Sequence, residues 1–206
     1  MKPNRCITCP RYKGTYIGPL GSSVGAKVVF LLEAPPSWAR VSLSGRESDL
    51  LKTVLQRAAG TDSTGTTASM INSALYMYSV ACTANATTTV KDVRTCSDNV
   101  GAQQLINSGA EVVVVFGAKP LSFFGLKDKH SSLLGGVKEV NFHGKQIKLI
   151  TTFSVAQLLR EPGLADIISI DIQKAAKLVG GEQLDDLNVP RLLGDYDIPS
   201  SIEELT

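Results

Sequence analysis

Short apolar runs alternate with polar segments along the chain, and three of these runs predict buried strands. They cover residues 27–33, 74–81 and 111–116. The third run is β-branched and apolar on both faces, which is typical of strands inside parallel sheets. Residues 137–152 are expected to form a hairpin that turns near His143 and Gly144, with a second arm that leads into the last strand.

Helical periodicity characterises several of the segments between these runs. Residues 46–59 place their Leu, Val and Ala side chains on one stripe, and Gly60 follows as a natural C-terminal stop. Further helices are expected at residues 90–108, 120–124 and 164–179, and a Thr/Ser/Gly loop at residues 61–69. Strands that alternate with helices predict an α/β fold with a mostly parallel sheet.

A sheet of this kind also predicts the location of the functional site. In open α/β sheets, ligands bind beyond the carboxyl ends of the strands. In this chain those ends are residues 33–38, 81–88, 117–118 and 153–160. We therefore expect the functional side chains in these four segments.

Length and composition favour a folded α/β domain. A chain of 206 residues with 43% apolar residues buries enough surface to fold without disulfides. Its longest apolar run, Val112–Phe116, is far shorter than the roughly 20 residues of a membrane-spanning helix, so no membrane association is expected. The basic residues 1–13 lack an apolar stretch behind them, so we expect no secretory signal and a cytoplasmic location, where disulfides are rare.

Charge divides the chain into two parts. Residues 181–206 contain seven acidic residues and one arginine, a net charge of −6, whereas the whole chain is +2, so residues 1–180 carry +8. We therefore expect a domain over residues 1–180 and an acidic tail over residues 181–206. A basic body with an acidic tail indicates DNA contact through the body and a protein partner on the tail, although +8 over 180 residues also fits an ordinary surface.

The four cysteines form two pairs in the sequence. Cys6 and Cys9 form a CxxC motif followed by Pro10, and Cys82 and Cys96 are separated by 13 residues. A redox CxxC normally lies between a strand and a helix, whereas this one precedes the first predicted strand. Four thiolates hold either zinc or a [4Fe–4S] cluster, and the cysteines alone leave both open.

The order of motifs along the chain resembles one family. The motifs are a CxxCP near the start, Glu-Ala-Pro at 33–35, Gly-Arg at 45–46, a cysteine after the second strand and another in the next helix, Phe-Gly-Ala at 116–118, and Leu-Leu-Arg at 158–160. This pattern resembles the iron–sulfur (family 4 type) uracil-DNA glycosylases over about residues 6–179. The resemblance implies a three-layer α/β/α sandwich around a central four-stranded, mostly parallel sheet. It also implies that Cys6, Cys9, Cys82 and Cys96 hold a [4Fe–4S] cluster.

Three positions depart from the motifs of that family. Ser154 stands in place of the catalytic histidine, Tyr78 in place of the asparagine that reads the base, and Leu43 in place of the phenylalanine that stacks on it. A donor aimed at the charge that develops on the departing base is worth roughly 3–4 kcal/mol. An asparagine offers both a donor and an acceptor to a base edge, and stacking adds roughly 1–3 kcal/mol. We therefore expect uracil excision to be lost or greatly weakened.

The candidate site residues follow from the same segments. The catalytic candidates are Glu33 and Ser154. The candidates for substrate binding are Ala34, Pro35, Trp38, Leu43, Tyr78 and Arg160. Trp38 either stacks on a base or plugs the pocket, and the resemblance favours Arg160 as a contact to DNA phosphate.

Three functions fit these observations. The first is a DNA-binding iron–sulfur protein of the uracil-DNA glycosylase superfamily that acts in replication or repair as a binding or partner subunit, with a repair or replication protein on its tail. The second is an active glycosylase that hydrolyses the N-glycosidic bond of uracil or a modified base. The third is a zinc-stabilised α/β protein unrelated to DNA.

Overall fold

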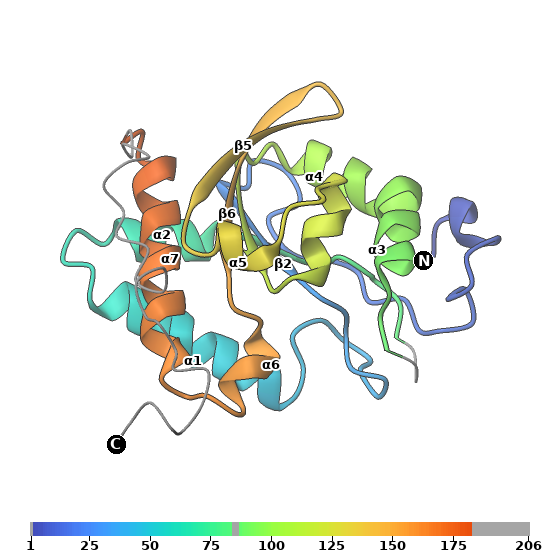
Figure 1. The fold of residues 1–206 in the computed structure, drawn as a ribbon, viewed down its shortest axis with the longest axis horizontal. Helices are drawn as coiled ribbons and strands as arrows, with labels where there is room; N and C mark the ends of the chain where they lie inside the picture. The colour runs from blue at the N-terminus through green and yellow to red at the C-terminus, as the bar shows by residue number, and fades with distance from the viewer. Residues whose placement is uncertain (1, 84–86, 183–206) are drawn as a thin grey trace, which may run out of the picture.

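The computed structural model describes residues 2–83 and 87–182. Its described part contains one six-stranded sheet in the order β1-β3-β2-β4-β6-β5 (Figure 1). The strands are β1 Leu20–Gly21, β2 Val28–Leu32, β3 Leu75–Tyr78, β4 Val112–Phe116, β5 Val137–Phe142 and β6 Lys145–Thr152. Strands β3, β2, β4 and β6 are parallel, and β1 and β5 pair antiparallel at the two edges.

This sheet confirms the predicted α/β fold with mostly parallel strands. The prediction of four strands is too low, because β1 and β5 extend the sheet to six. Strand β5 comes from the predicted hairpin, whose turn is at His143 and Gly144 as expected. Both residues have positive φ, 52° and 85°, which suits the tight turn of a two-residue hairpin. Strand β1 has only two residues and no sequence signal marked it.

Both faces of the sheet are covered, since every residue of β2 and β4 is buried. Alternate residues of these strands enter two separate hydrophobic clusters: Phe30 and Val114 belong to one, and Leu31 and Val113 to the other. The first cluster is completed by α1 Arg46–Gly60, α2 Thr66–Asn72 and α7 Leu164–Val179; the second by α3 Val90–Cys96, α4 Ala102–Ser108 and the short η3 Lys119–Phe124. Figure 1 shows these two groups of helices on opposite sides of the sheet.

Helices α1, α7 and η3 lie where the sequence predicted them. The predicted loop at 61–69 is wrong in its second half, where α2 begins. The Asp62 carboxylate accepts hydrogen bonds from the backbone N–H groups of Thr64 and Thr67, at 2.9 and 2.7 Å. Met70, on the same short helix, is buried against the core. A local acceptor and one buried anchor thus stabilise a helix in a segment whose composition is typical of a loop.

The predicted helix at 90–108 is present but interrupted by one wide turn. A π-helical turn, η2 Ser97–Gly101, separates α3 from α4. The Phe123 ring lies against Gly101, where an added Cβ would be 2.4 Å from the ring, and Ser97 Oγ donates to the Phe123 carbonyl at 3.0 Å. The wide turn therefore follows from close packing against η3, and it begins directly after Cys96.

Three short elements complete the described chain: η1 Asn4–Cys6, α5 His130–Leu133 and α6 Val155–Leu158. No helix in the described ranges is long and apolar enough to cross a membrane. Most of the acidic tail, residues 183–206, lies outside the described residues, so the role predicted for it stays a prediction.

Candidate functional site

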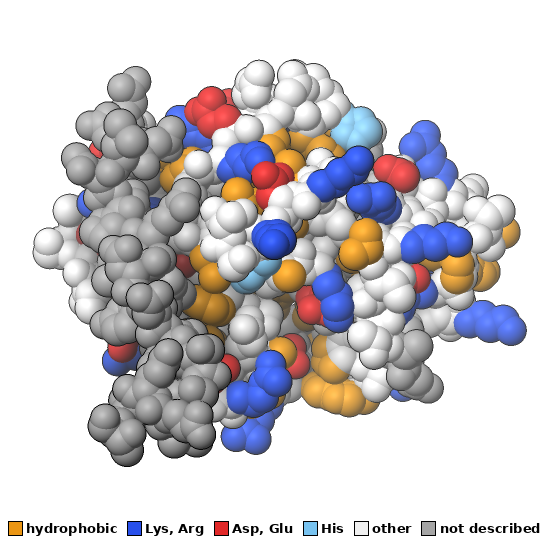
Figure 2. Space-filling view, viewed as in Figure 1, with side chains coloured by type: hydrophobic (Ala, Val, Ile, Leu, Met, Phe, Trp, Pro, Cys, Tyr) orange, Lys and Arg blue, Asp and Glu red, His pale blue; other side chains and the backbone are white. Residues whose placement is uncertain are grey.

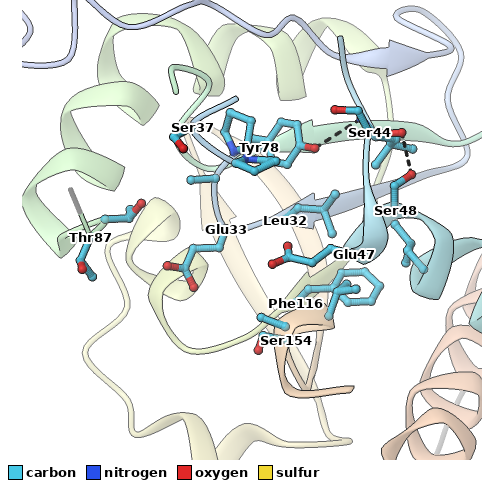
Figure 3. A pocket seen from close by; sticks show the side chains of 18 of the residues that line it. Leu32, Glu33, Ser37, Ser44, Glu47, Ser48, Tyr78, Thr87, Phe116 and Ser154 are labelled. Carbon is cyan, nitrogen blue, oxygen red and sulfur yellow. Dashed lines mark hydrogen bonds between the residues drawn. The ribbon is translucent and has the colours of Figure 1, made fainter. Parts of the chain in front are cut away.

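A cavity of about 290 Å³ opens at the carboxyl edge of the sheet. Leu32 of β2, Tyr78 of β3 and Phe116 of β4 line it, together with Ser154, which follows β6 (Figure 3). The cavity thus lies where the rule for open α/β sheets places a site.

Six of the eight predicted site residues line this cavity. They are Glu33, Ala34, Pro35, Leu43, Tyr78 and Ser154. Trp38 and Arg160 lie outside the lining. The Trp38 indole packs over Gly45 and is 57% exposed, and Arg160 is exposed beyond the end of α6. Trp38 therefore does not plug the pocket in this structure.

Glu33 is paired with a lysine from the neighbouring strand end. Lys119 Nζ, which follows β4, lies 2.7 Å from Glu33 Oε1, and each side chain is about one-third exposed. The two residues are 86 positions apart, and the parallel pairing of β2 with β4 brings them together. The pair holds the Glu33 carboxylate at the edge of the cavity.

A second carboxylate, which the sequence analysis missed, enters the cavity from α1. Glu47 is exposed as a whole residue, but its carboxyl group extends into the cavity on the side of Glu33 (Figure 3). Burial of this group raises the pKa of Glu47, and the negative charge of Glu33 raises it further. Acidic residues are common in the first turn of a helix, so no sequence signal distinguished Glu47 from Asp49.

Tyr78 supports the loop that forms one wall of the cavity. Its hydroxyl accepts a hydrogen bond from the Leu43 backbone N–H at 3.3 Å, and Ser48 Oγ donates to the Leu43 carbonyl at 2.6 Å. Leu43 has a φ of 51°, a left-handed conformation that costs free energy for a branched residue. Burial raises the pKa of Tyr78, so its hydroxyl keeps its proton.

Ser154, at the position of the missing histidine, uses its hydroxyl locally. Its Oγ and its backbone N–H both donate to Gln157 Oε1, at 3.0 and 2.9 Å. Gly117 packs against it, and a Cβ there would be 2.9 Å from that of Ser154. Neither histidine lines the cavity: His130 Nε2 lies 3.1 Å from the Thr152 carbonyl, and His143 forms the hairpin turn.

The N-terminal arm is held against the end of β3, which brings the two cysteine pairs together. Tyr16 and Cys82 form an antiparallel β-bridge, and the Thr83 N–H donates to the Thr15 carbonyl at 2.9 Å. Gly14 fits directly against the Thr83 carbonyl, where a Cβ would be only 1.9 Å away. These contacts place residues 6–9 beside the segment that carries Cys82.

All four thiols are free, and they are close enough to influence one another. Burial raises the pKa of Cys96 to about 11, with further increases from the other three cysteines, and the Ala81 N–H points to its sulfur at 3.3 Å. Burial also raises the pKa of Cys6 and Cys82, whereas the nearby Lys2 lowers both. The donor set is thus four thiols with basic groups beside them.

These thiols are not arranged around a single metal ion. Across residues 2–83 and 87–182, no three His, Cys, Asp or Glu side chains are grouped tightly enough to hold one ion. Tetrahedral zinc with Zn–S bonds of about 2.3 Å requires sulfurs only about 3.8 Å apart. In a four-iron cluster the four ligands are also cysteine thiolates.

Arg11 connects the cysteine region to the cavity. Its side chain lines the cavity and pairs with Asp92 of α3 at 2.9 Å. Its guanidinium also donates to the Thr87 carbonyl at 3.0 Å and lowers the pKa of Cys82. Arg11 therefore takes part in both the cysteine region and one wall of the cavity.

Lys and Arg side chains are distributed over the molecular surface. Figure 2 shows them spread across one face and interspersed with acidic groups, not gathered in one patch. Around the cavity, Arg40, Arg46 and Arg160 are exposed, and each lies within four positions of a lining residue.

In comparison with known proteins, no family model matches the chain, and no curated protein sequence matches it.

Proposed function

We propose that this chain is a DNA-binding iron–sulfur protein with the architecture of the uracil-DNA glycosylases, in which uracil excision is lost or greatly weakened. In this proposal it acts in replication or repair as a binding or partner subunit. The observation that carries the proposal is a convergence in space. Residues in or next to the motifs at 33–35, 45–46 and 116–118 line one cavity together with Arg11, which follows the CxxC motif, and the four cysteines are close enough to influence one another.

The fold supports this architecture. Helices on both faces of the sheet fit a three-layer α/β/α sandwich. Strands β3, β2, β4 and β6 would be its parallel centre, and β1 and β5 would be additions at the edges. A shared architecture alone does not imply a shared activity, so the proposal depends on the two sites.

The cysteine region offers the ligands for a cluster. Four buried or half-buried thiols from three segments are close enough to influence one another, and the order of the motifs favours iron–sulfur over zinc. Lys2 and Arg11 lower the pKa of Cys82, and such basic groups would stabilise the thiolate form that any metal centre needs. Cys6, Cys9, Cys82 and Cys96 would be the ligands.

The cavity supports a loss of excision. A departing base develops negative charge, which a positioned donor must stabilise. Ser154 directs its proton to Gln157, so it offers no free donor to a departing base. Glu47 adds a carboxyl group to the lining, and a carboxylate there would repel a developing negative charge.

DNA binding is supported by charge. Residues 1–180 carry +8, and Arg40, Arg46 and Arg160 are exposed and lie within four positions of lining residues in the sequence. Neutralising phosphates releases counterions, so the affinity should fall steeply with salt.

Fluorescence anisotropy with labelled single- and double-stranded oligonucleotides tests the proposal. We expect Arg160→Ala to weaken binding to all sequences about equally and to reduce the slope of log K against log salt by about 1. Lys27→Ala removes the same charge at the opposite end of β2 and should leave the slope unchanged. Affinity that does not change between low and high salt would refute DNA binding through the basic body.

The open cavity favours a second candidate function. Because Trp38 does not plug it, about 290 Å³ stays accessible beside Glu33 and Tyr78. An active glycosylase with a rebuilt pocket, specific for a base other than uracil, would use this space.

A further inference from the structure

Some polar groups of the cavity have hydrogen-bond or ion-pair partners within the protein, and others do not. Among the described residues, Glu33 is paired with Lys119, whereas Glu47 has no hydrogen-bond or ion-pair partner. Three serines of the lining already donate within the protein: Ser44 to the Val41 carbonyl, Ser48 to the Leu43 carbonyl and Ser154 to Gln157. The carboxyl group of Glu47 is therefore an acceptor in the cavity that the protein itself does not use.

Glu47 is positioned to accept a hydrogen bond from a ligand. Figure 3 shows its carboxyl group in the cavity, between Leu32 and Phe116 on one side and Glu33 on the other. These apolar neighbours leave the carboxyl group little protein to bond with. A ligand that offers an N–H donor at this point would satisfy it, and a carbonyl oxygen would meet repulsion.

Tyr78 supplies a donor in the same cavity. One lone pair of its hydroxyl is occupied by the Leu43 N–H, so its own proton is available to an acceptor on the ligand. Glu47 and Tyr78 line the same cavity (Figure 3). One acceptor and one donor therefore face a cavity with apolar walls.

We propose that this cavity selects nucleobases whose edge carries an exocyclic amine, of the cytosine or adenine type, over keto bases such as uracil, with Glu47 accepting from the amine and Tyr78 donating to the ring nitrogen. The inference rests on the proposed function, because it assumes that the cavity takes up a base from DNA. Carboxylates pair with the amine of cytosine in protein–DNA complexes. The keto oxygen of uracil at that position would face the carboxylate of Glu47.

The test uses full-length protein and DNA duplexes that differ only in one bulged nucleotide. Two matched pairs are compared by anisotropy: cytosine against uracil, and adenine against hypoxanthine. In each pair the two bases differ in the amine or keto group and in the protonation of the neighbouring ring nitrogen. We expect the amine member of at least one pair to bind about tenfold more tightly.

Glu47→Gln tests the residue itself. A glutamine amide donates as well as accepts, so the variant should bind both members of a pair about equally. Glu139→Gln, which removes the same charge on exposed β5, should keep the preference. Equal or tighter binding of the keto member in both pairs, or an unchanged preference in Glu47→Gln, overturns this inference and leaves salt-dependent DNA binding standing. No binding to any duplex at low salt overturns the proposed function as well.

Discussion

The cysteine region and the cavity both bring together residues from distant parts of the sequence. They differ in how many of the residues implied by the resemblance are present. Each gathers residues that lie far apart in the sequence, Cys6 with Cys96 in one and Glu33 with Ser154 in the other. The cysteine region has all four thiols, whereas the cavity keeps Glu33 and lacks the histidine, the asparagine and the aromatic ring. The topology of the sheet fixes where a site lies, and a few side chains decide what it does.

The substituted residues in the cavity also interact with the protein itself. Tyr78 accepts a hydrogen bond from Leu43, and Ser154 donates to Gln157. These two residues occupy positions that contact a base in the family that the chain resembles. In this protein they stabilise a loop and the start of a helix. Tyr78 and Ser154 therefore have structural roles in this protein.

The largest expected effect is the removal of one thiol. Cys82→Ser should lose most of its iron and lower Tm by on the order of 10 °C or more, because binding of a metal centre contributes directly to folding. Metal analysis and thermal unfolding of anaerobically purified protein measure both.

Tyr16→Phe is the matched control. It removes the hydroxyl that accepts from Gln104 at 2.8 Å, so it should cost only about 1 kcal/mol and keep the iron. A Cys82→Ser protein with its full metal content would show that this cysteine is no ligand.

A smaller effect compares Asp92, which pairs with Arg11 near the cysteines, with Asp171, which is buried on α7 away from both regions. Arg11 holds the pKa of Asp92 at about 2 through a hydrogen bond, whereas burial raises the pKa of Asp171 more than Thr152 and Lys174 lower it. Stability from Asp92 is therefore present above about pH 4 and lost as the pH falls toward 2. Stability linked to Asp171 is present below its unfolded pKa and is lost as the pH rises through its raised folded pKa.

The two asparagine variants should therefore change the pH dependence in opposite directions. Asp92→Asn should cost about 1 kcal/mol at neutral pH, since partial solvent exposure screens the pair, and should flatten the loss of stability below pH 4. Asp171→Asn should reduce the loss as the pH rises above 4. Thermal unfolding between pH 3 and 8 measures this, and parallel curves for the two variants would contradict it.

The smallest expected effect concerns the restored histidine. Ser154→His alone should release no more uracil than the unmodified protein, because Tyr78 and Leu43 still prevent productive binding, and residues that act together are not additive. Release of labelled uracil from single-stranded DNA measures this, with Ser154→Ala as the control. Strong activity in Ser154→His would mean that a single substitution separates this cavity from an active one.

Much of the fold was predictable from the sequence because its signals are local. The strands at β2 and β4 are continuous apolar runs, and α1 and α7 end in glycine. Helix α2 was missed, because it depends on the hydrogen bonds to Asp62 and on the burial of Met70, which no local composition reveals.

The site was predictable in position but not in its charges. The rule for strand ends located the cavity, and six predicted residues line it. The pair between Glu33 and Lys119 and the entry of Glu47 depend on how β2, β4 and α1 meet in space. Trp38 was expected to stack on a base or to plug the pocket. Its ring packs instead against Gly45, which has no side chain to block it, and does not line the cavity.

The central claim is that the metal centre is kept and uracil excision is lost in the same molecule. It is tested most directly by measuring metal content and uracil release in one anaerobic preparation of the unmodified protein. The account predicts about four iron ions per chain and no uracil release from single- or double-stranded DNA above background. One zinc ion without iron, or sustained release of uracil, would contradict it.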